Sequence, residues 1–192
     1  MLLRAAAAAF ARGGFQGTSM DDVAQEAGVT RLIVYRHFAG KEELYRAVLE
    51  QVTGRLADEL DAAMRSEAQV SVVAVLLSVA RAEPDAFRLL WVHAQHEPTF
   101  VDYAREVRRG AVAFAELLVG TRAPIDPTLH RWSVDNAVTA ASDAVLGWLD
   151  QGDPEGDARF VAVAGQGLGA MVASWAGVDA QRAVQPPSTA KV

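Results

Sequence analysis

Apolar residues recur along this chain at the three- and four-residue spacing that marks one face of an α-helix. Alanine- and leucine-rich segments dominate, and no run of alternating Val, Ile and Thr is bounded by hairpin turns. The pattern predicts an all-α protein of about nine helices. The longest regular stripe follows Lys41 and consists of Leu44, Val48, Val52, Leu56 and Leu60.

Glycines divide the first 45 residues into three short helices. We expect Gly13-Gly14, Gly28 and Ala39-Gly40 to end them, with Thr30 as an N-cap of the third. Residues 27–30 then form a short glycine-containing turn between the second and third helices. Such a turn is typical of a helix-turn-helix motif, whose second helix lies in the major groove of DNA.

The third helix carries an unusual outward face. Val34 and Phe38 are four residues apart and are expected to point into the core, so the other side chains must point outward. The outward set mixes apolar, cationic and hydroxyl-bearing residues: Arg31, Leu32, Ile33, Tyr35, Arg36 and His37. An exposed Leu-Ile pair among such neighbours suits a groove lined by thymine methyls and flanked by phosphates.

The net charge of −6 is unevenly distributed. Residues 1–55 hold 7 Lys and Arg against 6 Asp and Glu, a net +1, whereas the remainder holds 11 against 18, a net −7. The N-terminal region is therefore the part that tolerates a polyanion.

Four blocks in this region, residues 10–15, 18–30, 34–38 and 41–44, together resemble the DNA-binding domain of the TetR family of transcriptional repressors. The resemblance implies phosphate contacts from Thr18 or Ser19, Thr30, Tyr35, His37 and Lys41. It implies base contacts from Arg31, Leu32 and Ile33, with Arg36 as a further candidate. The implied function is a transcriptional regulator, a repressor that a small-molecule effector releases from its operator. Because one short helix reads few base pairs, we expect a homodimer on a pseudo-palindromic site in double-stranded DNA.

The resemblance divides the chain into a helix-turn-helix domain at 1–45 and an effector-binding and dimerisation domain at 46–180. Residues 181–192, which are rich in proline near the end, are predicted to be a disordered tail.

Aromatic and polar residues gather in the middle of the second region, a composition typical of a small-molecule pocket. The predicted ligand-binding residues are Phe87, Trp91, His93, Gln95, His96, Phe100, Tyr103 and Phe114. An ordinary core with hydrogen-bonded histidines is the alternative. His93 and His96, beside Glu97, also have a spacing compatible with metal ligands but lack a third ligand at a known spacing, so no metal or cofactor is predicted.

Gly165, Gly169 and Ala173 are four residues apart and would give the last helix a smooth face. Together with Trp132, Val145 and Trp148 on the preceding helix, they predict a four-helix dimer interface. Packing within one subunit is the alternative. The Gly165–Gly169 segment is superficially similar to a dinucleotide loop, but it lacks the preceding strand and the following acidic residue.

Several function classes are disfavoured. The chain has no cysteine, no Gly-x-Ser-x-Gly and no carboxylate pair that we can place in a cleft, so no enzyme and no catalytic residue is predicted. The longest apolar run, residues 70–80, is short of the ~20 residues of a membrane span, which predicts a cytoplasmic protein without a membrane partner. A helical interaction module whose helix-turn-helix no longer binds DNA remains the rival hypothesis.

Overall fold

The computed structural model describes residues 1–66, 71–120 and 126–184, and within these ranges every regular element is helical. Nine α-helices in this part of the chain confirm the predicted all-α class. The first four are α1 (Leu2–Gly17), α2 (Met20–Ala27), α3 (Arg31–His37) and α4 (Lys41–Arg65). The others are α5 (Val72–Ala82), α6 (Pro84–Arg88), α7 (Val101–Val119), α8 (Pro127–Gln151) and α9 (Asp157–Val184). Short turns complete the described chain: the π-helical η1 (Leu89–His93) and the 3₁₀ turns η2 (Ala94–His96) and η4 (Pro154–Gly156).

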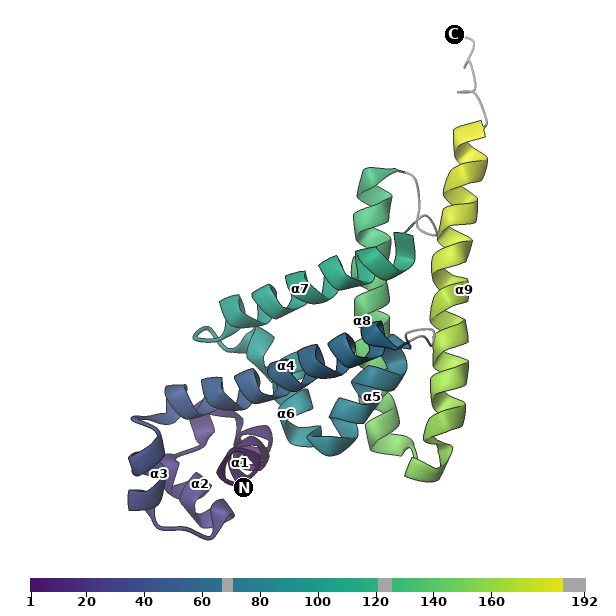
Figure 1. The fold of residues 1–192 in the computed structure, drawn as a ribbon. Helices are drawn as coiled ribbons and strands as arrows, with labels where there is room; N and C mark the ends of the chain where they lie inside the picture. Colours follow the sequence, from purple (N-terminus) through teal and green to yellow (C-terminus); the bar gives the residue numbers. More distant parts are fainter. Residues whose placement is uncertain (67–70, 121–125, 185–192) are drawn as a thin grey trace.

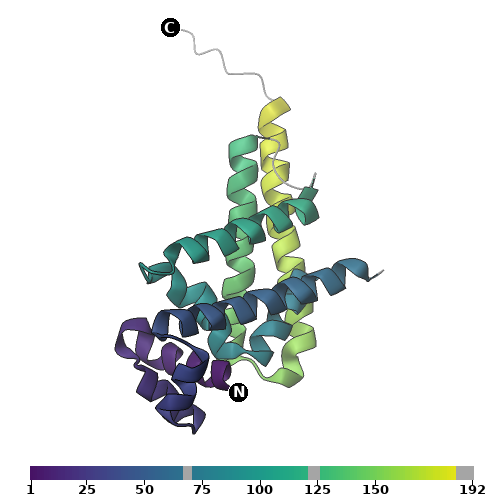
Figure 2. The ribbon, with the colours of Figure 1, turned by 60° about the vertical axis from the view of Figure 1, so that its left-hand side comes forward.

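The helices are arranged around α4. Helices α1 to α3 form a small domain at the N-terminal end of α4, and α8 and α9 stand side by side at the other side of the molecule (Figure 1). Helix α7 begins near the small domain and ends beside α8, and a view turned by 60° keeps this order (Figure 2). Helices α4 and α7 therefore both connect the two ends of the molecule.

Helix α1 contains a break at Gly14, where the sequence predicted its end. Gly14 has φ 67° and ψ 169°, a conformation that glycine adopts without the steric cost of a side chain. The chain then makes one further helical turn to Gly17. Phe10 and Phe15 flank the break and are both buried, which ties the two pieces into one core.

The predicted apolar stripe of α4 forms the central part of the core. Leu44, Val48, Val52 and Leu56 are buried, and the helix packs first against α1 and then against α5. Leu60, the last member of the stripe, is only partly buried.

Helix α9 has an unusual composition for an exposed helix. Residues 160–178 contain no Asp, Glu, Lys or Arg. By length and composition the span Pro154–Val178 would suffice to cross a membrane, with a mean hydropathy of 1.4, yet only 6% of its apolar window is buried within the chain. The helix continues to Val184, so the first residues of the predicted tail 181–192 are helical, and the rest lies outside the described residues.

Candidate nucleic-acid interface and interior cavity

The turn before α3 is built by local hydrogen bonds. Ser19 caps α2: its hydroxyl accepts from the Asp22 amide at 3.1 Å, and its own amide donates to the Asp22 carboxylate at 2.8 Å. The Ser19 hydroxyl also donates to the Asp22 carboxylate at 2.7 Å, and this bond, followed by the one from the Ser19 amide, holds the pKa of Asp22 below its usual value. At the other end Gly28 adopts φ 64°, and the Val29 amide donates to the Ala24 carbonyl oxygen at 3.0 Å. Both ends of α2 are thus fixed, which sets where α3 begins.

Helix α3 turns most of its side chains to solvent. Val34 is fully buried, whereas Leu32 is 79%, Ile33 42% and Tyr35 40% exposed. Arg31, Arg36 and His37 are exposed on the same helix. Apolar side chains at this exposure on a well-fixed helix are suited to a partner surface, and the dimensions of a helix match the major groove.

Arg31, Tyr35 and Lys41, all predicted to contact DNA, already have partners within the chain. The Arg31 guanidinium lies 3.0 Å from Asp21, donates to the Tyr35 hydroxyl at 3.3 Å and covers the Tyr35 ring. The Lys41 ammonium donates to the Gln16 carbonyl oxygen at 3.3 Å and lies 4.6 Å from the centre of the Phe15 ring. These contacts pre-position both cations beside α3.

The structure corrects the predicted phosphate contact of Thr18. Its side chain is 4% exposed, and its hydroxyl donates to the carbonyl oxygen of Gly14 at 2.7 Å, with that of Ala9 at 3.2 Å. The hydroxyl closes the break in α1 and does not face a phosphate. Ser19 and Thr30 are exposed at the starts of α2 and α3, so of the pair Thr18 or Ser19 only Ser19 is exposed.

A cavity of about 410 Å³ lies between α4, α5, η1, α7 and α8. Its lining is almost entirely apolar: Thr53, Leu56, Ala57, Leu60, Asp61, Val72, Leu76, Trp91, Val107, Gly110, Ala111, Phe114, Ala115, Val138 and Ala141. The Thr53 hydroxyl is within 2.9 Å of both the Leu49 carbonyl oxygen and the Tyr103 hydroxyl. The Trp91 indole N–H is buried and has no hydrogen-bond partner among the described residues.

The predicted ligand-binding set is only partly gathered here. Trp91 and Phe114 line the cavity, and Tyr103 borders it through Thr53. The remaining five lie elsewhere: Phe87 and Phe100 are fully buried in packed core, His93 is partly buried, and Gln95 and His96 are exposed. Sequence reasoning missed the aliphatic wall, because residues such as Leu56 or Ala111 do not differ from ordinary core residues in type or spacing.

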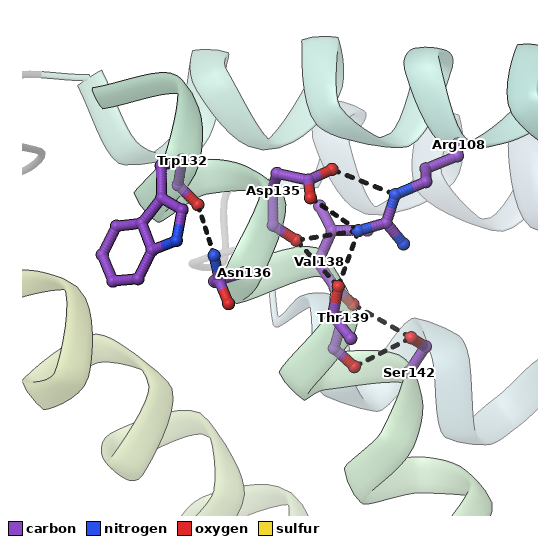
Figure 3. A network of polar contacts seen from close by, with 7 residues as sticks. All are labelled: Arg108, Trp132, Asp135, Asn136, Val138, Thr139 and Ser142. Carbon is purple, nitrogen blue, oxygen red and sulfur yellow. Dashed lines mark hydrogen bonds and ion pairs between the residues drawn. The ribbon is translucent and has the colours of Figure 1, made fainter. Parts of the chain in front are cut away.

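Helix α7 is held against α8 by one arginine. Arg108 makes a two-pronged contact with the Asp135 carboxylate at 2.8 and 3.0 Å and donates to the Thr139 hydroxyl at 2.7 Å (Figure 3). The hydroxyl of Ser142, one turn further along α8, donates to the carbonyl oxygens of Val138 and Thr139. Because paired, parallel hydrogen bonds fix orientation, this network sets the position of α7 on α8.

The predicted dimer residues divide into two groups. Trp132 is 49% exposed, Gly169 and Ala173 are exposed, and Gly165 and Gly169 have open space where a side chain would stand. Val145, however, is fully buried in the core of its own subunit, so its prediction is wrong. Trp148 stacks on Phe160 at 4.8 Å and is partly buried, which also gives it an internal role.

Among the described residues, no group of three or more His, Cys, Asp or Glu side chains could hold a metal ion. The His93 and His96 alternative therefore gains no third ligand in this part of the chain.

The small domain formed by α1 to α3 matches a known protein family. Residues 2–48 match the family model of bacterial regulatory proteins, tetR family, and this range contains α1, α2, α3 and the start of α4. This small domain belongs to the TetR family. Every residue predicted to contact DNA lies inside the matched range.

The length of this chain that resembles a known relative differs from one relative to the next. The HTH-type transcriptional activator FasR of Mycolicibacterium smegmatis is 38% identical over 65 residues, covering 34% of this chain and 30% of FasR. The HTH-type transcriptional regulator RutR of Escherichia coli is 29% identical over 137 residues, covering 66% of this chain and 65% of RutR. The chain thus matches less than two thirds of the length of either relative.

The TetR-family fold covers nearly the whole chain. A TetR-like transcriptional regulator from Rhodococcus sp. RHA1 superimposes with a TM-score of 0.73 over 92% of this chain and 93% of that chain, at 19% identity. At this identity the likeness concerns the fold alone.

Proposed function

We propose that the chain is a transcriptional regulator that reads double-stranded DNA with α3. The observation that carries the proposal is the exposure of Leu32 and Ile33, at 79% and 42%, on a helix whose start is fixed by the caps of α2. Burial of these side chains against thymine methyls would give base preference, while Ser19, Thr30, Tyr35, His37 and Lys41 would hold phosphates.

The DNA-reading form is a homodimer. Helix α3 has 7 residues, which reach too few base pairs to select one site in a genome. The uncharged, exposed part of α9 and the exposed Trp132 form an apolar surface whose contact with water is unfavourable. A second copy related by a two-fold axis would cover this surface and present two reading helices to a pseudo-palindrome.

A small, mostly apolar effector occupies the cavity and releases the DNA, which makes the protein a repressor. A cavity of 410 Å³ lies within the range of small-molecule sites. Four arginines of this region form ion pairs: Arg88 with Asp150, Arg105 with Asp102, Arg108 with Asp135 and Arg109 with Glu106. None of them lines the cavity, so a neutral ligand is favoured.

Selection from a library of randomised duplexes tests the reading function. We expect enrichment of one pseudo-palindrome, bound as a dimer, with an affinity that falls steeply between two salt concentrations. An unenriched library at both salt concentrations would favour the interaction-module hypothesis and overturn the proposal.

Substitution of Gly169 tests the dimer. Gly169→Glu places a carboxylate in the proposed interface and should give a monomer in sedimentation. The matched control is Gly54→Glu on α4, where the glycine is also exposed and has open space for a side chain. A dimer that persists in Gly169→Glu, or one that is lost equally in Gly54→Glu, contradicts the assigned interface.

A further inference from the structure

Phe100 joins the effector half of the chain to the core of the small domain. It is the residue before α7, is fully buried, and stacks on Tyr45 of α4 at 4.4 Å between ring centres. It also meets the edge of Phe15 at 5.2 Å, and Phe10 meets Tyr45 at 5.0 Å. We call Phe10, Phe15, Tyr45 and Phe100 the aromatic cluster. Three of its rings belong to the DNA-reading domain and one to the effector-binding region.

The aromatic cluster leads directly to a proposed phosphate contact. Phe15 lies under the Lys41 ammonium, which is bonded to the Gln16 carbonyl oxygen next to it. A displacement of Phe100 therefore reaches Lys41 through one intervening ring. It also reaches the start of α4 through Tyr45, which is fully buried.

The helix that carries Phe100 is also a wall of the cavity. Val107, Ala111 and Phe114 of α7 line the cavity, and Tyr103, one turn after Phe100, is hydrogen-bonded to the lining residue Thr53. None of the residues within α7 is fully buried, in contrast to Phe100 just before it. A helix packed this loosely can move when the cavity is filled.

Arg108 determines how α7 can move. Its contacts with Asp135 and Thr139 hold the middle of α7 on α8, as Figure 3 shows. A ligand that displaces α7 near Ala111 while Arg108 holds its place would tilt the helix and so displace its first turn, next to Phe100. Packed aromatic rings offer discrete arrangements instead of gradual sliding, so a small tilt can change the cluster.

We propose that Phe100 is a positioning residue for the DNA-reading domain: through its seat in the aromatic cluster, α7 transmits occupation of the cavity to α1 and the start of α4. This inference rests on the proposed function for its DNA readout. Phe100 then transmits a change in the cavity to the DNA-reading domain, which differs from the ligand contact that the sequence suggested for this residue.

A double-mutant cycle tests the route without knowledge of the natural effector. Ala111→Phe places a ring in the cavity and should weaken binding to the selected duplex about 5- to 150-fold, the usual range of allosteric coupling. In the Phe100→Leu background, which keeps an apolar side chain but removes the ring, the same change should weaken binding by less than about two-fold. Equal effects in both backgrounds would overturn the proposal.

Tyr45→Phe is the matched control within the aromatic cluster. The Tyr45 hydroxyl is buried without a hydrogen-bond partner among the described residues, so this change keeps the ring and removes only the hydroxyl. The full effect of Ala111→Phe should persist in the Tyr45→Phe background. Loss of the effect there would show that the cycle reports general damage to the core and would count against a specific role for the Phe100 ring.

Hydrogen exchange gives a second readout that needs no DNA. Binding of the neutral apolar dye N-phenyl-1-naphthylamine, followed by its fluorescence, should change amide protection in residues 10–16 and 41–46 of the wild-type protein. In Phe100→Leu the changes should stay within the cavity helices. Changes that reach α1 equally in both proteins would refute the route, even if DNA binding itself had failed in the selection experiment.

Discussion

Thr18 gives a sharp test of the structure, because sequence and structure assign it different roles. Its hydroxyl is buried and donates to the Gly14 carbonyl oxygen at 2.7 Å, across the break in α1. Gly13 is adapted to this contact, since a Cβ atom there would lie 2.6 Å from the Thr18 hydroxyl oxygen. Thr18→Val keeps the shape of the side chain and removes the donor.

The expected cost follows from the carbonyl group that loses its partner. A buried acceptor left without a hydrogen bond costs about 1–3 kcal/mol of unfolding free energy. In a protein of this size each kcal/mol lowers Tm by about 2–4 °C. Thr18→Val should therefore be clearly destabilised, while its affinity for the selected duplex, measured on folded protein, stays at the wild-type value.

Chemical unfolding and duplex titration are the assays, with Thr30→Val as the matched control. Thr30 is exposed, and its side chain makes no capping hydrogen bond. Its variant should be within about 0.5 kcal/mol of wild type in stability but weaker in DNA binding. The reverse pattern, a stable Thr18→Val with weakened DNA binding, would refute the placement of this hydroxyl.

Three further outcomes are expected. Lys41→Ala should weaken binding to all duplexes alike and lower the salt slope by about 1 in a gel-shift titration. Hydrogen bonds from Arg81, and to a smaller extent from the Trp148 indole, hold the pKa of Asp157 below its usual value. This carboxylate therefore stabilises the fold above pH ~4. The stabilisation is lost as the pH falls through the lower folded-state pKa. Asp157→Asn should thus lower the unfolding free energy by about 1–3 kcal/mol at pH 7 and by progressively less below pH ~4 in urea titrations. Trp91→Phe removes an indole N–H that has no partner in the described part of the chain. Any ligand that accepts a hydrogen bond from it should therefore bind less tightly, whereas an apolar dye should bind equally well by fluorescence.

The small domain could be predicted from sequence because its signals are local. The glycine at position 28 adopts the left-handed conformation expected of it, and Ser19 caps α2 as a hydroxyl residue before a helix should. Local chemistry could not separate Thr18 from Ser19, since both are hydroxyl residues at the same boundary. Only the fold of α1 back over Thr18 decides which hydroxyl is internal.

The helices after α4 could be predicted only in outline because their cavity and surfaces depend on contacts between distant helices. Aromatic composition indicated a pocket near Trp91 and Phe114, but the same composition also builds the aromatic cluster around Phe100, and residue type does not distinguish a cavity wall from a packed core. For the last two helices, spacing shows which residues share a face. It does not show whether that face meets the same subunit, as at Val145, or is left open, as at Gly169.

We propose that the exposed apolar pair of α3 reads bases, and the sharpest experiment repeats the duplex selection with Leu32→Ser. Leu117→Ser is the matched control, since Leu117 is 76% exposed on α7, close to the 79% of Leu32. Leu32→Ser should change the preferred bases at symmetric positions of both half-sites, with a discrimination change of about 1–3 kcal/mol, while Leu117→Ser should select the wild-type sequence. Selection of the wild-type sequence by Leu32→Ser, with undiminished affinity, would contradict it.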